Sequence, residues 1–149
     1  MVTPEERDQL ITTYCATFGD AAHNIARRCD ALLAETDELF SAEQKTDIKR
    51  IHNAVQKFLS LVETARQFAV TQGWASRESR EFDEFMARWI HDLRTPLNLV
   101  IGFAQLFLEG GMGPLNDRQQ EAMEYICKLG QGLLSKIDEM LNLSRQASA

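Results

Sequence analysis

Residues 82–107, FDEFMARWIHDLRTPLNLVIGFAQLF, carry apolar side chains at alternating steps of four and three residues. The series is Phe82, Met86, Trp89, Leu93, Pro96, Val100, Phe103 and Phe107. Such spacing keeps one face of an α-helix apolar over many turns, and that face forms the seam of a helix bundle. The stretch therefore predicts a long helix that packs against other helices.

Three further segments of the chain repeat this spacing. One contains Ile48, Ile51, Val55, Phe58, Val62, Ala65 and Ala69. Another contains Met123, Ile126, Gly130, Leu133, Ile137 and Met140. The N-terminal one contains Tyr14, Phe18, Ala21, Ile25 and Leu32, with Arg28 as an exception. No strand-like alternation competes over a comparable length, so the sequence predicts an all-α fold, an antiparallel four-helix bundle made of two helical hairpins.

Local signals place the ends of the helices in the first half. The first helix is expected from about Pro4 to Thr36, since proline is compatible with the first turn of a helix. The second begins at the capping-box pattern 41–44, SAEQ. It ends near Gly73, which can adopt the left-handed conformation that closes a helix.

Similar signals bound the helices of the second half. Ser76 is predicted to cap the third helix, which ends at the glycine pair 110–111. A second cap-like pattern begins at Asn116, and the fourth helix runs to about Arg145. Trp74 lies in the linker between the halves, where it can cover the end of the bundle.

The two halves of the chain resemble each other. A shift of 75 positions superposes five identical residues of the second and fourth helices: Gln44, Ile51, Gln56, Leu59 and Ser60 fall on Gln119, Ile126, Gln131, Leu134 and Ser135. A shift of 68 brings His23 onto His91. Any two bundle hairpins share heptads, but the matched histidines favour a tandem repeat of hairpins at 1–73 and 76–149.

Composition excludes several functions. The net charge of −6 argues against a nucleic-acid partner. The most apolar stretch, 97–108, contains polar residues and is too short to span a bilayer, so no membrane partner is expected. Cys15, Cys29 and Cys127 lack disulfide or metal spacing and predict reduced core thiols of a cytoplasmic protein. No Glu-x-x-His pair recurs on two helices, so no metal site is expected.

The segment 89–97, WIHDLRTPL, holds a histidine on the outer side of its helix. Trp89 and Leu93 fall on the core-facing heptad positions, and His91 falls between them. An exposed histidine is usually only a solvated surface residue, but its neighbours here favour a chemical role.

Four neighbours of His91 suit phosphoryl chemistry. Imidazole is substantially neutral near pH 7 and can attack a phosphoryl group, and the adjacent acid Asp92 can orient and activate it. Thr95 lies on the same helix face, where its hydroxyl can hold a water in line with a phosphorylated His91. Arg94 brings positive charge to the transferring group. Pro96 cannot donate a hydrogen bond to the carbonyl of Asp92, which loosens or kinks the helix after the histidine.

The motif at 91–97, HDLRTPL, resembles the H-box of sensor histidine kinases. Residues 98–106 are similar to the continuation of that helix, 113–116 to the hairpin loop, and 125–145 to the second helix. The resemblance covers about 82–145 and points to the dimerisation and histidine phosphotransfer domain of two-component systems.

This resemblance implies a role for each residue of the motif. His91 would be phosphorylated on a ring nitrogen, Asp92 would assist that step, and Thr95 would position water for dephosphorylation of a partner response regulator. The receiver domain of that regulator would dock along the outer faces of the third and fourth helices. Family members dimerise, so that two hairpins make one four-helix bundle.

The sequence departs from the family in two ways. The family's ATP-binding α/β domain follows the hairpin, and no glycine-rich nucleotide lid occurs in this sequence. We therefore expect no cofactor here: ATP and Mg²⁺ would act only through a histidine-kinase ATP-binding domain, in trans or in a larger kinase. Whether this chain alone is an enzyme stays open.

The second departure lies in the first hairpin. His23 is followed by Asn24, Ala26 and the arginines 27–28, without the activating acid or the proline. We expect this hairpin to be a degenerate copy that completes a single-chain pseudo-dimer. A second phosphoacceptor at His23, and a conventional homodimer, are the alternatives.

Two functions follow as hypotheses. In the first, His91 accepts a phosphoryl group and relays it to or from a receiver aspartate in a phosphorelay. In the second, the bundle docks on receiver or kinase domains and regulates them without chemistry. The intact His-Asp-x-Arg-Thr-Pro set favours the first, because docking alone does not require it.

Overall fold

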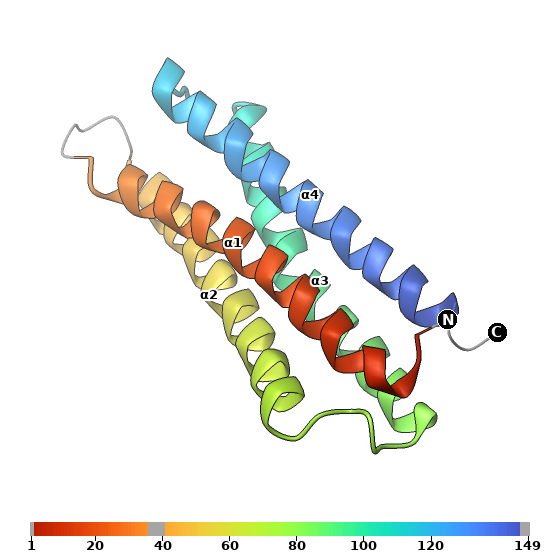
Figure 1. Cartoon of the computed structure of the whole chain (residues 1–149). Coiled ribbons are helices and arrows are strands. Elements are labelled where there is room, and N and C mark those ends of the chain that lie inside the picture. Colours follow the sequence, from red (N-terminus) through yellow and green to blue (C-terminus); the bar gives the residue numbers. More distant parts are fainter. Residues whose placement is uncertain (1, 36–40, 147–149) are drawn as a thin grey trace.

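The computed structural model describes residues 2–35 and 41–146, which form one short 3-10 helix and four long α-helices. The elements are η1 (Pro4–Glu6), α1 (Arg7–Leu33), α2 (Ala42–Thr71), α3 (Ser79–Leu108) and α4 (Asp117–Gln146). The α-helices lie side by side in alternating directions (Figure 1). The predicted all-α bundle of two antiparallel hairpins is confirmed.

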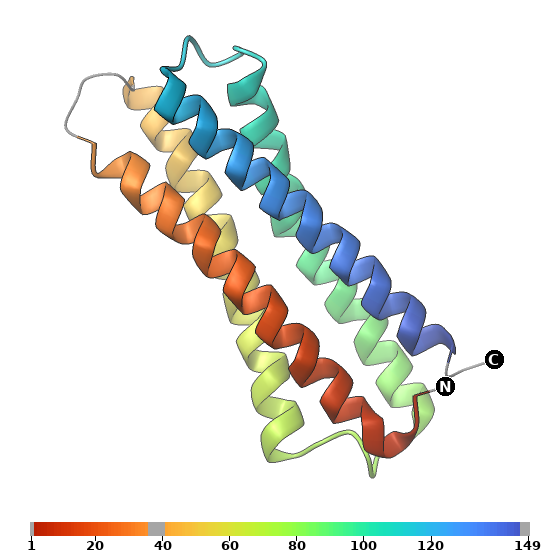
Figure 2. The ribbon, with the colours of Figure 1, turned by 45° about the horizontal axis from the view of Figure 1, so that its top comes forward.

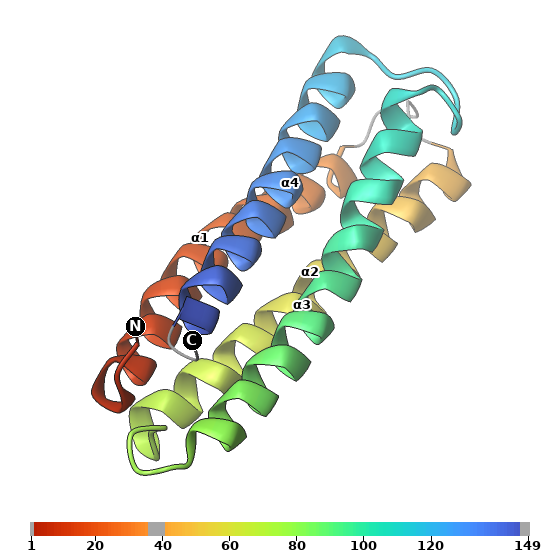
Figure 3. The ribbon, with the colours of Figure 1, turned by 90° about the vertical axis from the view of Figure 1, so that its right-hand side faces the viewer.

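The four helices follow one another around the bundle. α1 packs on α2, α2 on α3, α3 on α4, and α4 returns to α1. Figures 2 and 3 show the same order, with α1 beside α4 and α2 beside α3. The corresponding helices of the two hairpins, α1 with α3 and α2 with α4, therefore lie on the diagonals, as an approximate two-fold axis would place them.

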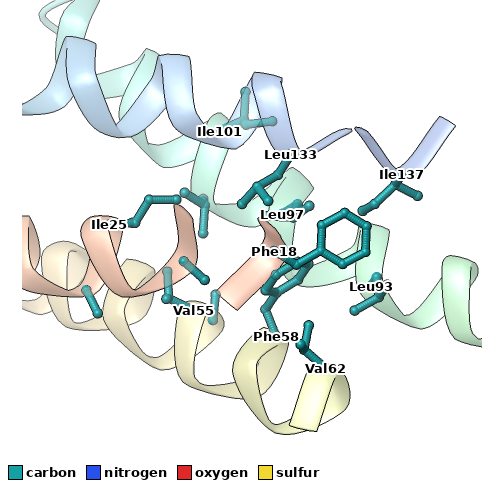
Figure 4. Close-up of a cluster of buried hydrophobic side chains, with 14 of the residues drawn as sticks. Phe18, Ile25, Val55, Phe58, Val62, Leu93, Leu97, Ile101, Leu133 and Ile137 are labelled. Atoms are coloured by element: carbon teal, nitrogen blue, oxygen red, sulfur yellow. The ribbon is translucent and has the colours of Figure 1, made fainter. Parts of the chain in front are cut away.

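The core is formed by the heptad seams. Every predicted seam position of α2 and α4 is buried, and in α3 only Phe103 is partly exposed. Leu93, Val100, Phe58 and Ile137 have no exposed surface. Figure 4 shows side chains of all four helices converging in this core. Burying these seams removes a large apolar area from water, which is the main force that joins the two hairpins.

One row of the α1 seam lies one residue later than predicted. The predicted row was Tyr14, Ala21 and Arg28. The buried row is Cys15, Ala22 and Cys29. Both rows alternate correctly with Phe18, Ile25 and Leu32, so heptad spacing alone does not separate them. The guanidinium of Arg28 instead lies 4.3 Å from the ring centre of Tyr125 on α4, outside the seam.

The ends of α1 also differ from the prediction. Its first turn, Pro4–Glu6, is a 3-10 helix rather than the start of the α-helix. Short 3-10 turns are common at helix ends. α1 then ends at Leu33, whereas the predicted end at Thr36 lies outside the described residues.

Matching caps begin the second helix of each hairpin. The Ser41 hydroxyl accepts from the Gln44 N–H at 3.1 Å, and the Gln44 side chain accepts from the Ser41 N–H at 2.7 Å. The same exchange joins Asn116 and Gln119, at 2.7 and 3.0 Å. The two capping boxes stand 75 positions apart, in agreement with the shift that relates the halves.

The start of α3 differs from the prediction, because Ser76 does not cap it. The N-cap position is Glu78, which makes no side-chain cap hydrogen bond. Gly73, with a φ of 80°, ends α2 as expected. The chain then turns at Trp74, whose carbonyl accepts from the Arg77 N–H at 3.1 Å, and Ser76 lies within that turn.

Arg7 joins the start of α1 to this linker. Its guanidinium donates to the carbonyls of Trp74 at 3.1 Å and Arg77 at 2.9 Å, and to the Ser79 hydroxyl at 2.8 Å. The side chain of Asp8 accepts from the Trp74 N–H at 2.8 Å. These contacts close the end of the bundle where one hairpin passes into the other, with the Trp74 side chain buried there.

Candidate functional site

His91 lies near the middle of α3 and is exposed. Trp89 and Leu93, two residues before and after it, are 4% and 0% exposed, as the heptad predicts. The His91 imidazole makes no hydrogen bond or ion pair with any residue in the described part of the chain. Both ring nitrogens are therefore available to a partner.

Thr95 and Pro96 shape the helix just after the histidine. The Thr95 hydroxyl donates to the backbone carbonyl of His91 at 3.3 Å. Its oxygen keeps lone pairs that can accept from a water near the imidazole. Pro96 is buried, and α3 continues through it as one helix. Because proline has no N–H, the carbonyl of Asp92 loses its usual helical donor.

Asp92 lies on the side of His91 that faces α2. It is exposed, and it lines an open groove of about 420 Å³ between α2 and α3. Arg88 and Trp89 line the same groove from α3, and Ser60 and Thr64 line it from α2. The carboxylate thus lies at the edge of a groove that both hairpins line, on the helix that carries His91.

Arg94 lies on the opposite side of His91, which faces α4. Its guanidinium pairs with the Asp138 carboxylate of α4 at 2.5 Å. The two side chains are 39% and 60% exposed, so water reaches the pair. Sequence reasoning did not identify Asp138, because a contact between residues 44 positions apart has no local sequence signal.

The site residues of the motif are thus brought together on one helix, and His23 is not among them. His23 is exposed on α1, on the diagonal from α3. Around it, the Arg27 guanidinium donates to the side-chain oxygen of Asn24, and Ala26 is buried. The residue after His23 is therefore an amide rather than an acid, and Ala26, three residues after it, cannot form the ion pair that Arg94 makes.

The described ranges, 2–35 and 41–146, show neither a metal site nor a membrane span. They contain no group of three or more His, Cys, Asp or Glu side chains placed to hold a metal ion. Among the same residues, no helix is long and apolar enough to cross a membrane.

Sequence comparisons connect this site to known proteins. The family described as His Kinase A (phospho-acceptor) domain matches residues 83–149. The autoinducer 2 sensor kinase/phosphatase LuxQ of Vibrio cholerae is 36% identical over 90 residues, 60% of this chain and 10% of the relative. The cell-division control histidine kinase PdhS of Brucella ovis is 38% identical over 72 residues, 48% of this chain and 7% of the relative. PdhS of Brucella suis shows the same agreement.

The chain thus spans at most a tenth of the length of these relatives. No solved structure matches it significantly. The family match contains α4 and all of α3 after its first four residues, and hence the whole motif around His91. Residues 83–149 of this chain are therefore similar to the His Kinase A phospho-acceptor domain family.

Proposed function

We propose that His91 accepts a phosphoryl group and relays it to or from the receiver aspartate of a response regulator. The observation that carries this proposal is the open imidazole of His91 on α3, flanked by Asp92 on one side and Arg94 on the other. A neutral ring nitrogen attacks phosphorus, the P–O bond to the receiver aspartate breaks, and that carboxylate leaves. The adjacent Asp92 carboxylate orients the ring and takes up the imidazole proton.

The remaining motif residues act after the transfer. Thr95 holds a water near the phosphoryl group, which supports dephosphorylation of the partner. LuxQ is named a sensor kinase/phosphatase, which agrees with a motif that serves both directions. Pro96 cannot make the helical hydrogen bond to the carbonyl of Asp92, so α3 can bend beside His91.

We propose that ATP and Mg²⁺ are held by a histidine-kinase ATP-binding domain, in trans or in a larger kinase, and that a receiver domain docks on the outer faces of α3 and α4. Leu99 and Leu106 of α3 are 40% and 46% exposed and give a partner apolar surface. The three unpaired, buried thiols support a reducing, cytoplasmic location.

We also propose that the first hairpin takes the place of a second subunit. The seams of α3 and α4 are covered by α1 and α2 of the same chain. In this pseudo-dimer the hairpin at 1–73 is a degenerate copy and only the His91 face transfers phosphoryl groups. The changes around His23 support that asymmetry.

The test is phosphoryl transfer followed by intact mass spectrometry. The protein is incubated with phosphorylated receiver domains, and separately with ATP alone. We expect a gain of one phosphoryl group from a receiver and none from ATP. His91→Gln should abolish the gain, and the matched variant His23→Gln should retain it.

Other outcomes would reject parts of the proposal. A gain that survives His91→Gln but not His23→Gln would move the acceptor to the first hairpin. No gain from any receiver or kinase domain, with tight binding to one of them, would favour a docking module without chemistry.

A further inference from the structure

We propose that Asp138 is a positioning residue for the phosphoacceptor site. It holds the Arg94 guanidinium against α4 while His91 is unmodified, and releases it when His91 carries a phosphoryl group. The inference deepens the proposed function and rests on it. Nothing in the H-box itself indicates Asp138, which lies on α4 and reaches the site because α4 packs on α3.

The first support is the geometry of the pair. Arg94 lies three residues after His91, so the two side chains are neighbours on the surface of α3. Its guanidinium is nevertheless directed to Asp138, at 2.5 Å, rather than to His91 or Asp92. This cation, on the α4 side of the acceptor histidine, is thus paired with Asp138 in the unmodified protein.

The second support is the absence of this pair from the degenerate half. The shifts of 68 and 75 place Ala26 at the position of Arg94 and Glu63 at the position of Asp138. Ala26 is buried, and Glu63 accepts hydrogen bonds from Arg66 and Gln67 of its own helix. Among the described residues, the interhelical ion pair is therefore present in the hairpin with the complete motif and absent at the matched positions, 26 and 63, of the first hairpin.

The third support is the weakness of the pair. Exposed ion pairs contribute little to stability, because water and salt screen them. A phosphoryl group on the imidazole carries more charge than one carboxylate and offers three oxygens, and arginine binds such groups through two parallel hydrogen bonds. Arg94 can therefore exchange Asp138 for the phosphoryl group without disturbing the core.

The exchange has a consequence for the lifetime of phosphohistidine. In hydrolysis, water adds to phosphorus, the P–N bond breaks, and a proton goes to the released imidazole nitrogen. The transition state is loose and resembles metaphosphate. Metaphosphate carries one negative charge, whereas the phosphoryl group on the imidazole carries two. Arg94 binds the charged ground state better than this transition state, and so slows hydrolysis. Asp138 competes for Arg94 and shortens the lifetime.

The chain has three histidines, His23, His52 and His91. The test uses the full chain with His23→Gln and His52→Gln, so that His91 is the one histidine left, and potassium phosphoramidate as phosphoryl donor. In this reaction the P–N bond of the donor breaks, a P–N bond to His91 forms, and the donor nitrogen leaves as ammonium with the imidazole proton. After removal of the donor, loss of phosphohistidine is followed by ³¹P NMR. This readout needs neither a receiver nor a kinase.

We expect Asp138→Asn to lengthen the half-life about twofold to fivefold, the range that releasing an exposed ion pair allows. Asp138→Glu should restore the parent value, because it keeps the charge. Arg94→Ala should shorten the half-life, and adding Asp138→Asn to it should change nothing further. The matched control is Glu63→Gln, which removes the exposed i,i+3 pair of Glu63 with Arg66 on α2 and should leave the half-life unchanged.

Three results would overturn the inference. One is an unchanged half-life in Asp138→Asn. Another is the same lengthening in the Arg94→Ala background. The third is failure of His91 to accept the group from phosphoramidate. A lengthened half-life with no transfer to any receiver would instead retain the role of Asp138 and reject the proposed function.

Discussion

Arg7 shows how a single residue joins the two hairpins. A guanidinium that is 5% exposed must have its donors satisfied, and here it bonds two linker carbonyls and the Ser79 hydroxyl. It also lies 5.2 Å from the ring centre of Phe82. The charge is thus held where the chain passes from one hairpin to the next.

Replacing Arg7 should therefore cost stability. We expect Arg7→Met to lower the free energy of unfolding by about 2–4 kcal/mol, because buried carbonyls lose a charged donor. Urea denaturation measures the change. The matched variant Arg66→Met loses only an exposed pair with Glu63 and should stay within about 0.5 kcal/mol. Equal losses in both variants would contradict the role of Arg7.

The buried thiols predict how stability depends on pH. Burial raises the pKa of Cys15 and of Cys29 from 9.0 to about 12. The folded state thus holds these protons more tightly than the unfolded state, so unfolding releases protons above pH 9. The stabilisation is complete below about pH 9 and is lost as the pH rises toward 12.

Denaturation midpoints at a series of pH values from about 7 to about 11 measure this effect. The loss should be smaller in a Cys15→Ala, Cys29→Ala double variant. Some loss should remain, because burial and a hydrogen bond to Glu139 raise the pKa of Tyr14 to about 12. A midpoint that stays constant to about pH 11 in the parent protein would show that the thiols ionise freely in the folded state.

At the scale of elements, Gly130 sets the spacing of α3 and α4. A Cβ at this position would lie 2.8 Å from Cγ1 of Ile101, which is a buried β-branched side chain with little rotamer freedom. The position that corresponds to Gly130 in the first hairpin is Val55, so α1 and α2 meet with a larger side chain in the seam.

A pair of glycine substitutions tests this contact. Gly130→Ala should destabilise the protein by about 1–2 kcal/mol, because overpacking outweighs the gain in helix propensity. A Cβ added at Gly132, two residues later, would meet no atom of the described residues within 4 Å. Gly132→Ala should therefore stabilise by about 0.5–1 kcal/mol. Thermal and urea unfolding compare the two, and stabilisation by both would mean that α3 and α4 are not in close contact there.

The helices were predictable from sequence because heptads and capping boxes are local patterns. The fold class, the caps at Ser41 and Asn116 and the outward position of His91 all follow from spacing. The errors arose where tertiary contacts decide. The linker turn at Trp74, bonded by Arg7 and Asp8, moved the start of α3 past Ser76.

The same limit applies to the seam of α1 and to the site. Spacing fits Arg28 and Cys29 equally well, and the structure separates them: Cys29 is buried, and Arg28 lies on the ring of Tyr125. The motif residues around His91 are contiguous and could be found by spacing. Asp138 comes from another helix, and the sequence offers no pattern that joins it to Arg94.

At the scale of the whole molecule, one chain supplies all four helices of the core. Across the described residues, α1 and α2 cover the seams of α3 and α4, so the second hairpin offers no open seam to another copy. We therefore expect light scattering to give the mass of one chain. Twice that mass at all concentrations would contradict the pseudo-dimer and favour a conventional homodimer.

The repeat gives a second form of this prediction. A chain shortened to 76–149 exposes the seams that α1 and α2 cover, and the matching heptads allow a second copy to cover them. We expect this fragment to form a dimer, with the mass of two fragments. When the hairpin 1–73 is added, we expect a complex of one fragment with one hairpin instead. A monomeric, folded fragment would argue against the two halves being equivalent.

The aromatic contacts between the hairpins give the molecule an optical reporter of its own. The chain has two tryptophans, Trp74 and Trp89, which are 7% and 4% exposed. The Trp74 ring lies 4.7 Å from that of Phe68 of α2, and the Trp89 ring lies 6.3 Å from that of Phe18 of α1. The Trp89 indole also donates to the Leu61 carbonyl of α2 at 3.2 Å. Their emission should therefore be blue-shifted while the hairpins are together and move to longer wavelength when they part. Separation of the halves can thus be followed in unlabelled protein, at concentrations far below those that scattering requires.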